Sequence, residues 1–193
     1  MIFAISPKHT TEDFKNGWNL DDKIDVFIAR VEGWQLGVAN TLVEKNIPHR
    51  KFAILMIIIN YFEMIAKYRD GYVEAIKGRR KGEGKSAHFF KEGLKDVFPD
   101  MSLPEDELVT AAMYENVRNG LYHAGGTRNN VLLSDEIPNT VGYNTITGAI
   151  AINPDLLVRE LQSHFARFSA KLRDPANTTL RANFEARFDV DNE

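Results

Sequence analysis

The chain has 193 residues, of which 44% are hydrophobic and 26% charged, proportions that are ordinary for a globular protein with one sizeable core. Its net charge of −3 excludes a generally basic surface, so any contact with RNA has to be local. The absence of cysteine excludes disulfide bonds and thiolate metal ligands, and it favours a cytoplasmic location.

Residues 1–20 predict little regular structure, and we interpret them as an N-terminal extension. Ile2–Ile5 could form a short strand, but Pro7 and Gly17 disfavour regular structure across the rest. We expect no signal peptide, because no basic region followed by a long apolar core is present. We also expect no membrane partner, since the longest apolar run, at 52–59, is far shorter than the roughly 20 residues of a membrane span.

Two long helices are expected next. The first begins after Asp21 or Asp22, either of which is a suitable N-cap, and its apolar residues follow at helical spacing to about Lys45. The second is expected over 51–77. Its run 52–59 is apolar on all sides, which is typical of the buried central helix of a bundle.

A basic loop follows at 78–85, and its residues Arg79, Arg80 and Lys81 have two interpretations. The loop is either a solvated connection or a contact for the phosphates of a substrate, because its basic residues create a local positive potential. It does not match a nucleotide-binding P-loop, since the spacing fails and no strand precedes it.

Two further helices are expected after this loop. The first lies between Ser86, which can cap it, and Pro99, which ends it. The second begins at Pro104, and Gly125 with Gly126 ends it in the left-handed conformation that glycine favours.

The second of these helices has two different sides. Its apolar stripe, which must face a core, consists of Val109, Met113, Val117, Leu121 and Ala124. Its opposite side carries Glu115, Arg118, Asn119, Tyr122 and His123. That polar side is either a site or interface, or simply the outward side of an ordinary core helix. Gly120 is small enough to let another stretch of backbone approach closely.

The pattern changes after Gly126. Residues 129–133 and 149–153 are β-prone, and 139–148 supplies turn residues, so a small hairpin is expected. A last helix then begins at Pro154, with apolar residues at helical spacing.

These elements predict an all-α protein, an antiparallel helical bundle of about five helices with a small β-hairpin insertion before the last helix. The helical domain is expected over 21–173. Residues 174–193 are rich in Asn, Asp and Arg and are interpreted as an exposed C-terminal tail, which Phe184 and Phe188 could dock.

The segment R-N-G-L-Y-H at 118–123 resembles the signature of the HEPN superfamily (higher eukaryote and prokaryote nucleotide-binding domains). That signature is an Arg, a polar residue, a few variable positions and a His, which Arg118, Asn119 and His123 match directly. The order of expected elements is also similar to that of small stand-alone prokaryotic members. The resemblance implies an all-α fold that dimerises so that two copies of the motif line one cleft. Many members are metal-independent endoribonucleases.

The motif residues suit RNA cleavage without a metal, which needs proton transfer and positive charge against the developing phosphorane. We assign proton transfer to His123, phosphate stabilisation to Arg118 and orientation to Asn119. Tyr122 is a candidate for base stacking or substrate positioning. One Arg and one His provide too few groups, which is the physical reason to expect a homodimer.

Other polar residues are expected to have structural roles. Glu115 is expected to form an ion pair with Arg118 across one turn. Glu63 is expected at an edge of its helix or in hydrogen bonds. We expect no metal site and no cofactor, since the remaining histidines lack partners at metal-ligand spacing: His9, His49, His88 and His164.

Three functions remain open. The first is a dimeric HEPN-type ribonuclease, a toxin or antiphage effector kept in check by an antitoxin or other regulatory protein. The second is the same fold without catalysis, binding nucleotide or RNA through the same cleft. The third is a helical protein–protein interaction domain whose polar side is an interface.

Overall fold

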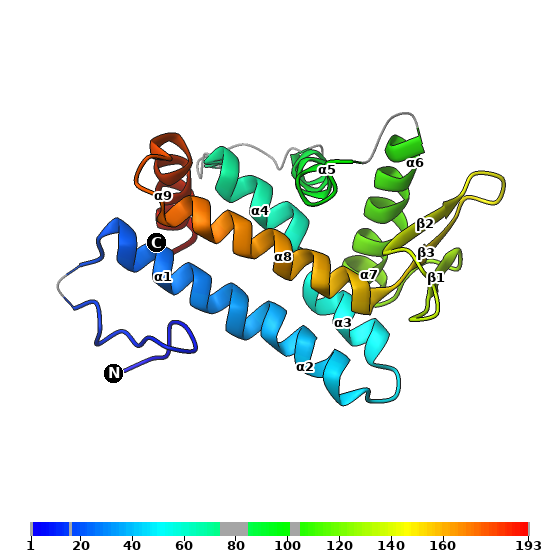
Figure 1. Ribbon diagram of the computed structural model, residues 1–193, viewed down its shortest axis with the longest axis horizontal. Coiled ribbons are helices and arrows are strands. Elements are labelled where there is room, and N and C mark those ends of the chain that lie inside the picture. The colour runs from blue at the N-terminus through cyan, green and yellow to red at the C-terminus, as the bar shows by residue number, and fades with distance from the viewer. Residues whose placement is uncertain (1, 16, 74–84, 101–104, 193) are drawn as a thin grey trace.

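The computed structural model describes residues 2–15, 17–73, 85–100 and 105–192, and it shows a mainly helical chain with one small sheet (Figure 1). The helical elements are α1 (Leu20–Arg30), η1 (Val31–Leu36), α2 (Gly37–Lys45), α3 (Arg50–Ile58), α4 (Tyr61–Asp70), α5 (Lys85–Val97), α6 (Glu105–Ala112), η2 (Met113–Arg118), α7 (Asn119–Ala124), α8 (Pro154–Arg173) and α9 (Thr178–Asn192). The strands are β1 (Val131–Leu133), β2 (Val141–Asn144) and β3 (Ala149–Ile152). None of the helices in this described part of the chain is long and apolar enough to cross a membrane.

The first predicted helix is confirmed as one continuous stretch, α1–η1–α2, in which η1 is π-helical. Its N-cap is Asn19 rather than Asp21 or Asp22. The Asn19 side chain accepts a hydrogen bond from the backbone N–H of Asp22, and the Asp22 carboxylate accepts one from the backbone N–H of Asn19. The stretch ends at Asn46 in the left-handed conformation, and Figure 1 shows it running beside α8 in the opposite direction.

The second predicted helix is wrong in its extent, because the chain forms two helices there. The break falls at Ile59 and Asn60, where the ψ angle of Asn60 is −10°, away from the helical value of about −42°. The second of the two helices, α4, ends at Asp70, because Gly71 takes the left-handed conformation. The run Phe52–Ile59 also has one uncovered side, since Phe52 and Met56 are 38% and 45% exposed.

The residues predicted as an exposed C-terminal tail instead form helix α9, which packs on α4 and α1. Phe184 and Phe188 are buried, so the docking expected of these two residues is confirmed. The ring of Phe184 lies 5.2 Å from that of Phe27 and 5.4 Å from that of Tyr68, measured between centroids. These two aromatic residues, four positions apart, therefore pack a polar helix against the common core.

The predicted hairpin is a three-stranded sheet with β3 in the centre. β2 pairs with β3 in the antiparallel direction and β1 pairs with β3 in parallel. The predicted hairpin between 129–133 and 149–153 is therefore wrong, because these segments pair in parallel. The hairpin is β2–β3, and its turn is shorter than the predicted 139–148. The side chain of Asn144 shortens it by accepting hydrogen bonds from the backbone N–H groups of Ile146 and Thr147.

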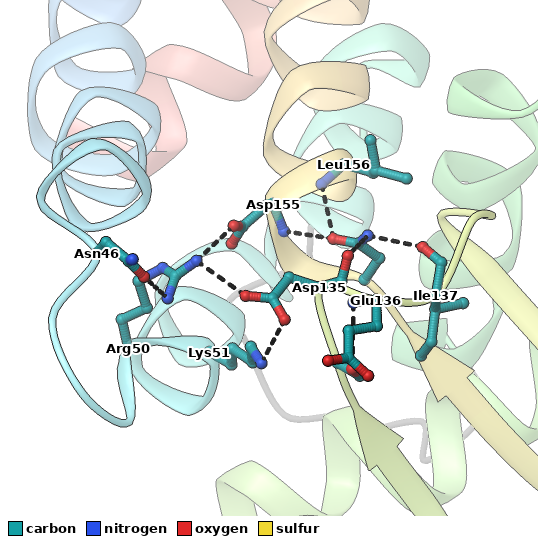
Figure 2. Close-up of polar contacts among 10 residues, drawn as sticks. Asn46, Arg50, Lys51, Asp135, Glu136, Ile137, Asp155 and Leu156 are labelled. Carbon is teal, nitrogen blue, oxygen red and sulfur yellow. Dashed lines mark hydrogen bonds and ion pairs between the residues drawn. The ribbon is translucent and has the colours of Figure 1, made fainter.

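A polar network joins this sheet region to α3 and α8 (Figure 2). The Nη2 atom of Arg50 donates to Asp155 at 2.7 Å and to Asp135 at 3.3 Å, and the Nζ atom of Lys51 donates to Asp135 at 2.8 Å. Asn153 caps α8 and donates to the carbonyl oxygen of Asp135. The hydrogen bond from Lys51 contributes most to lowering the pKa of Asp135.

Candidate functional site

The motif lies on one helical stretch, α6–η2–α7, whose apolar side faces the core as predicted, apart from the exposed Ala124. The buried residues of that side include Met113, Val117 and Leu121. Arg118 is the last residue of the π-helical η2, a geometry that is frequent at functional sites. His123 is exposed in the last turn, and Gly125 ends the helix with a φ angle of 66°, as expected.

The chain beyond the helix folds back along it at Gly120. The N–H group of Gly126 donates to the carbonyl of Gly120 at 3.3 Å, and the N–H group of Arg128 donates to the carbonyl of Asn116 at 3.0 Å. A Cβ atom at position 120 would lie 2.6 Å from the carbonyl oxygen of Gly126. The close backbone approach predicted at Gly120 is therefore confirmed, and it brings residue 128 back beside the motif helix.

Arg118 makes contacts with several side chains. Its Nη2 atom donates to Glu63 Oε2 at 2.9 Å and to Ser86 Oγ at 3.0 Å, and its Nη1 atom donates to Asn119 Oδ1 at 3.2 Å. The guanidinium carbon lies 4.6 Å from the ring centre of Tyr122, and the side chain is 17% exposed. These contacts fix the orientation of the guanidinium group.

Glu63 is the partner of Arg118 that sequence reasoning did not identify, because 55 residues separate the two in the chain. Its Oε1 atom accepts from Lys67 at 2.7 Å, and its Oε2 atom accepts from the hydroxyl of Ser86 at 2.7 Å. Ser86, which was expected to cap α5, thus bridges Glu63 and Arg118. Burial alone would raise the pKa of Glu63, but the hydrogen bonds from Lys67 and Ser86 and the charges of Lys67 and Arg118 lower it.

The ion pair predicted between Glu115 and Arg118 is wrong. Glu115 instead accepts a hydrogen bond from Asn119 at 3.4 Å and lies 4.0 Å from the Nη2 atom of Arg128. The side chain of Glu115 is 54% exposed, whereas that of Glu63 is 13% exposed. Water screens a charge less where it is more buried, so Arg118 pairs with Glu63.

The polar side of the motif helix borders two separate hollows. Arg118 and Tyr122 line the first, which has a volume of about 220 Å³ and lies against α4 and α9. Asn119 and His123 line the second, which has a volume of about 550 Å³ and includes Arg128. Arg118 and His123 therefore do not line one common hollow within a single chain.

Of the remaining predicted site residues, the structure describes Tyr122 but not those in the basic loop. Tyr122 is 53% exposed, so much of its ring is accessible to a substrate. Arg79, Arg80 and Lys81 lie outside the described residues, and their contact with phosphate stays a prediction.

A second polar cluster lies buried between α4, α5 and α8. The hydroxyl of Tyr61 is 2.8 Å from the Nδ1 atom of His164, whose Nε2 atom is 3.5 Å from Asp96. The hydrogen bond with His164 contributes most to lowering the pKa of Asp96. None of these three side chains lines a hollow that contains a motif residue, so we interpret the cluster as a packing contact.

Comparisons with protein-family models, with curated proteins and with solved structures gave no match to this chain. The resemblance to the HEPN superfamily therefore stays a prediction that depends on the motif at 118–123 and on the order of the elements.

Proposed function

We propose that the protein is a metal-independent endoribonuclease of the HEPN type. It acts in the cytoplasm as a homodimer, as a toxin or antiphage effector under the control of an antitoxin or regulatory protein. The observation that carries this proposal is the exposed His123 on the same helical stretch as Arg118, whose guanidinium group is held in place by Glu63. The imidazole transfers protons at neutral pH, and the oriented guanidinium stabilises negative charge on phosphate.

Two protomers are needed because Arg118 and His123 border different hollows of one protomer. A two-fold axis beside the motif helix would bring His123 of one copy towards Arg118 of the other. Exposed apolar residues on neighbouring helices support such an interface: Trp34 and Val38 on η1 and α2, and Phe52 and Met56 on α3. Asn60 and Met64, which follow α3 in the chain, line the hollow of Arg118.

The dimer is the first testable consequence. Light scattering at micromolar concentration should report twice the mass of the chain, and Met56→Glu should convert it to a monomer with unchanged helical content. Met56 is 45% exposed in one protomer, so the substitution introduces a charge only into the interface. The matched control is Ile146→Glu at the hairpin turn, where the residue is 93% exposed and the dimer should persist. A wild-type chain that stays monomeric at all concentrations contradicts the prediction.

The chemistry is tested by the products of cleavage. Labelled RNA should be cut in the presence of EDTA and should end in a 2′,3′-cyclic phosphate or a 3′-phosphate, because the 2′-hydroxyl is the attacking nucleophile. DNA of the same sequence should remain intact. A requirement for a divalent ion, or products with a 5′-phosphate, would overturn the proposed mechanism.

A second candidate function is a non-catalytic module that binds RNA or nucleotide. One observation favours it: Glu63 already neutralises Arg118, so less of the positive charge is available to stabilise a developing phosphorane. Salt-sensitive RNA binding without any cleavage would select this function. The absence of both binding and cleavage would instead favour a protein–protein interaction domain, whose contact surface would include the exposed apolar residues on α2 and α3.

A further inference from the structure

Arg128 and His123 border the same hollow of the motif helix, and the lining of that hollow does not include Glu63. Both residues line the larger hollow, together with Asn119 and Gly126. The hydrogen bond from the backbone of Arg128 to the carbonyl of Asn116 fixes the place of this residue along the helix. The position of Arg128 in the site thus results from folding, although the residue lies outside the motif in the sequence.

The side chain of Arg128 is available to a ligand. It is 61% exposed, and its ion pair with Glu115 is long, at 4.0 Å, with a carboxylate that is itself 54% exposed. Such a long, exposed pair is weak, so a phosphate can replace it at little cost. Arg118 has fewer donors left for a phosphate, because its Nη2 atom already donates to Glu63 and Ser86 and its side chain is 17% exposed.

We propose that Arg128 is a phosphate-binding residue that holds the RNA backbone in the hollow beside His123. This inference rests on the proposed function and deepens it, since it identifies the ligand of the larger hollow as a phosphodiester of the substrate strand. The guanidinium of Arg128 binds a phosphate adjoining the scissile one in a bidentate manner, and the amide of Asn119 lies within the same hollow. The carboxylate of Glu115 competes with that phosphate for Arg128.

The experiment measures the binding of a single-stranded RNA that is 2′-O-methylated throughout, so that it cannot be cut, over a range of salt concentrations. Arg128→Ala should weaken binding about tenfold and should reduce the slope of log affinity against log salt by about 0.7, the value for one lost phosphate contact on a single strand. Glu115→Gln should act in the opposite direction and tighten binding, because it removes the competing charge. Arg159→Ala, which removes an exposed arginine from α8, is the matched control and should leave affinity and slope unchanged.

Cleavage of unmodified RNA by the same proteins separates the possible failures. Suppose that the wild type binds and cuts RNA, and that Arg128→Ala binds it with the affinity and salt slope of the wild type and of Arg159→Ala. The role of Arg128 is then overturned, and the proposed function stands. Weaker binding in Glu115→Gln also overturns it. A wild type that neither binds nor cuts RNA overturns the proposed function itself, and the role of Arg128 with it.

Discussion

Replacing His123 by Ala should lower the rate of RNA cleavage by at least about 10²-fold, the usual loss when a general acid or base is removed. The imidazole is exposed in the last turn of α7 and lines the larger hollow. Its removal should therefore leave the free energy of unfolding within about 0.5 kcal/mol of the wild-type value. The measurement is single-turnover cleavage of labelled RNA, beside urea denaturation of the same protein.

His88→Ala is the matched control for this substitution, because His88 is also an exposed histidine on a helix but lines neither hollow of the motif helix. Its cleavage rate should equal that of the wild type. Cleavage at the wild-type rate in His123→Ala would exclude proton transfer by this residue, and the non-catalytic module would then become the favoured function.

Replacing Arg118 by Lys should reduce cleavage nearly as much as replacing it by Ala. The guanidinium reaches Glu63, Ser86 and Asn119 at the same time and lies over the ring of Tyr122. A lysine ammonium is a compact point charge and offers no planar fork to make this set of contacts. We expect losses of at least about 10²-fold for both substitutions, as for other groups that stabilise transition-state charge.

The free energy of unfolding of the Arg118 variants distinguishes a catalytic role of Arg118 from a purely structural one. Arg118→Ala removes one partner of Glu63, but Lys67 remains paired with that carboxylate. The free energy of unfolding should therefore fall by about 1–3 kcal/mol, and not by the roughly 3–5 kcal/mol typical of a buried charge left unpaired. Arg159→Lys on α8 should change neither stability nor cleavage. A variant Arg118→Lys that cuts RNA at the wild-type rate would contradict the catalytic role of the fork.

Local signals predicted much of the helical stretch that carries the motif. The buried stripe, the termination at Gly125 and the close approach at Gly120 each depend on residues near one another in the chain. The partners of Arg118 could not be predicted in the same way. Glu63 and Ser86 come from α4 and α5, and only the packing of these helices brings them to η2.

Two errors elsewhere in the chain have different physical causes. The apolar run from Phe52 to Ile59 masked the break at Asn60, since continuous hydrophobicity carries no information on where hydrogen bonding between turns is interrupted. Helix α9 was missed because its core contact depends on two residues, Phe184 and Phe188, in an otherwise polar segment. For α9, tertiary packing outweighs the local pattern.

The break between α3 and α4 also determines which sequence changes this site can tolerate during evolution. Each residue inserted into or deleted from a helix rotates the remainder of that helix by about 100°. One such change between Asn60 and Glu63 would turn the carboxylate away from Arg118, and Lys67 would turn with it. The turn at 145–148, where Ile146 is 93% exposed, has no comparable constraint. Among relatives of this chain, length variation should therefore accumulate in the β2–β3 turn, while the spacing from Asn60 to Lys67 should be kept.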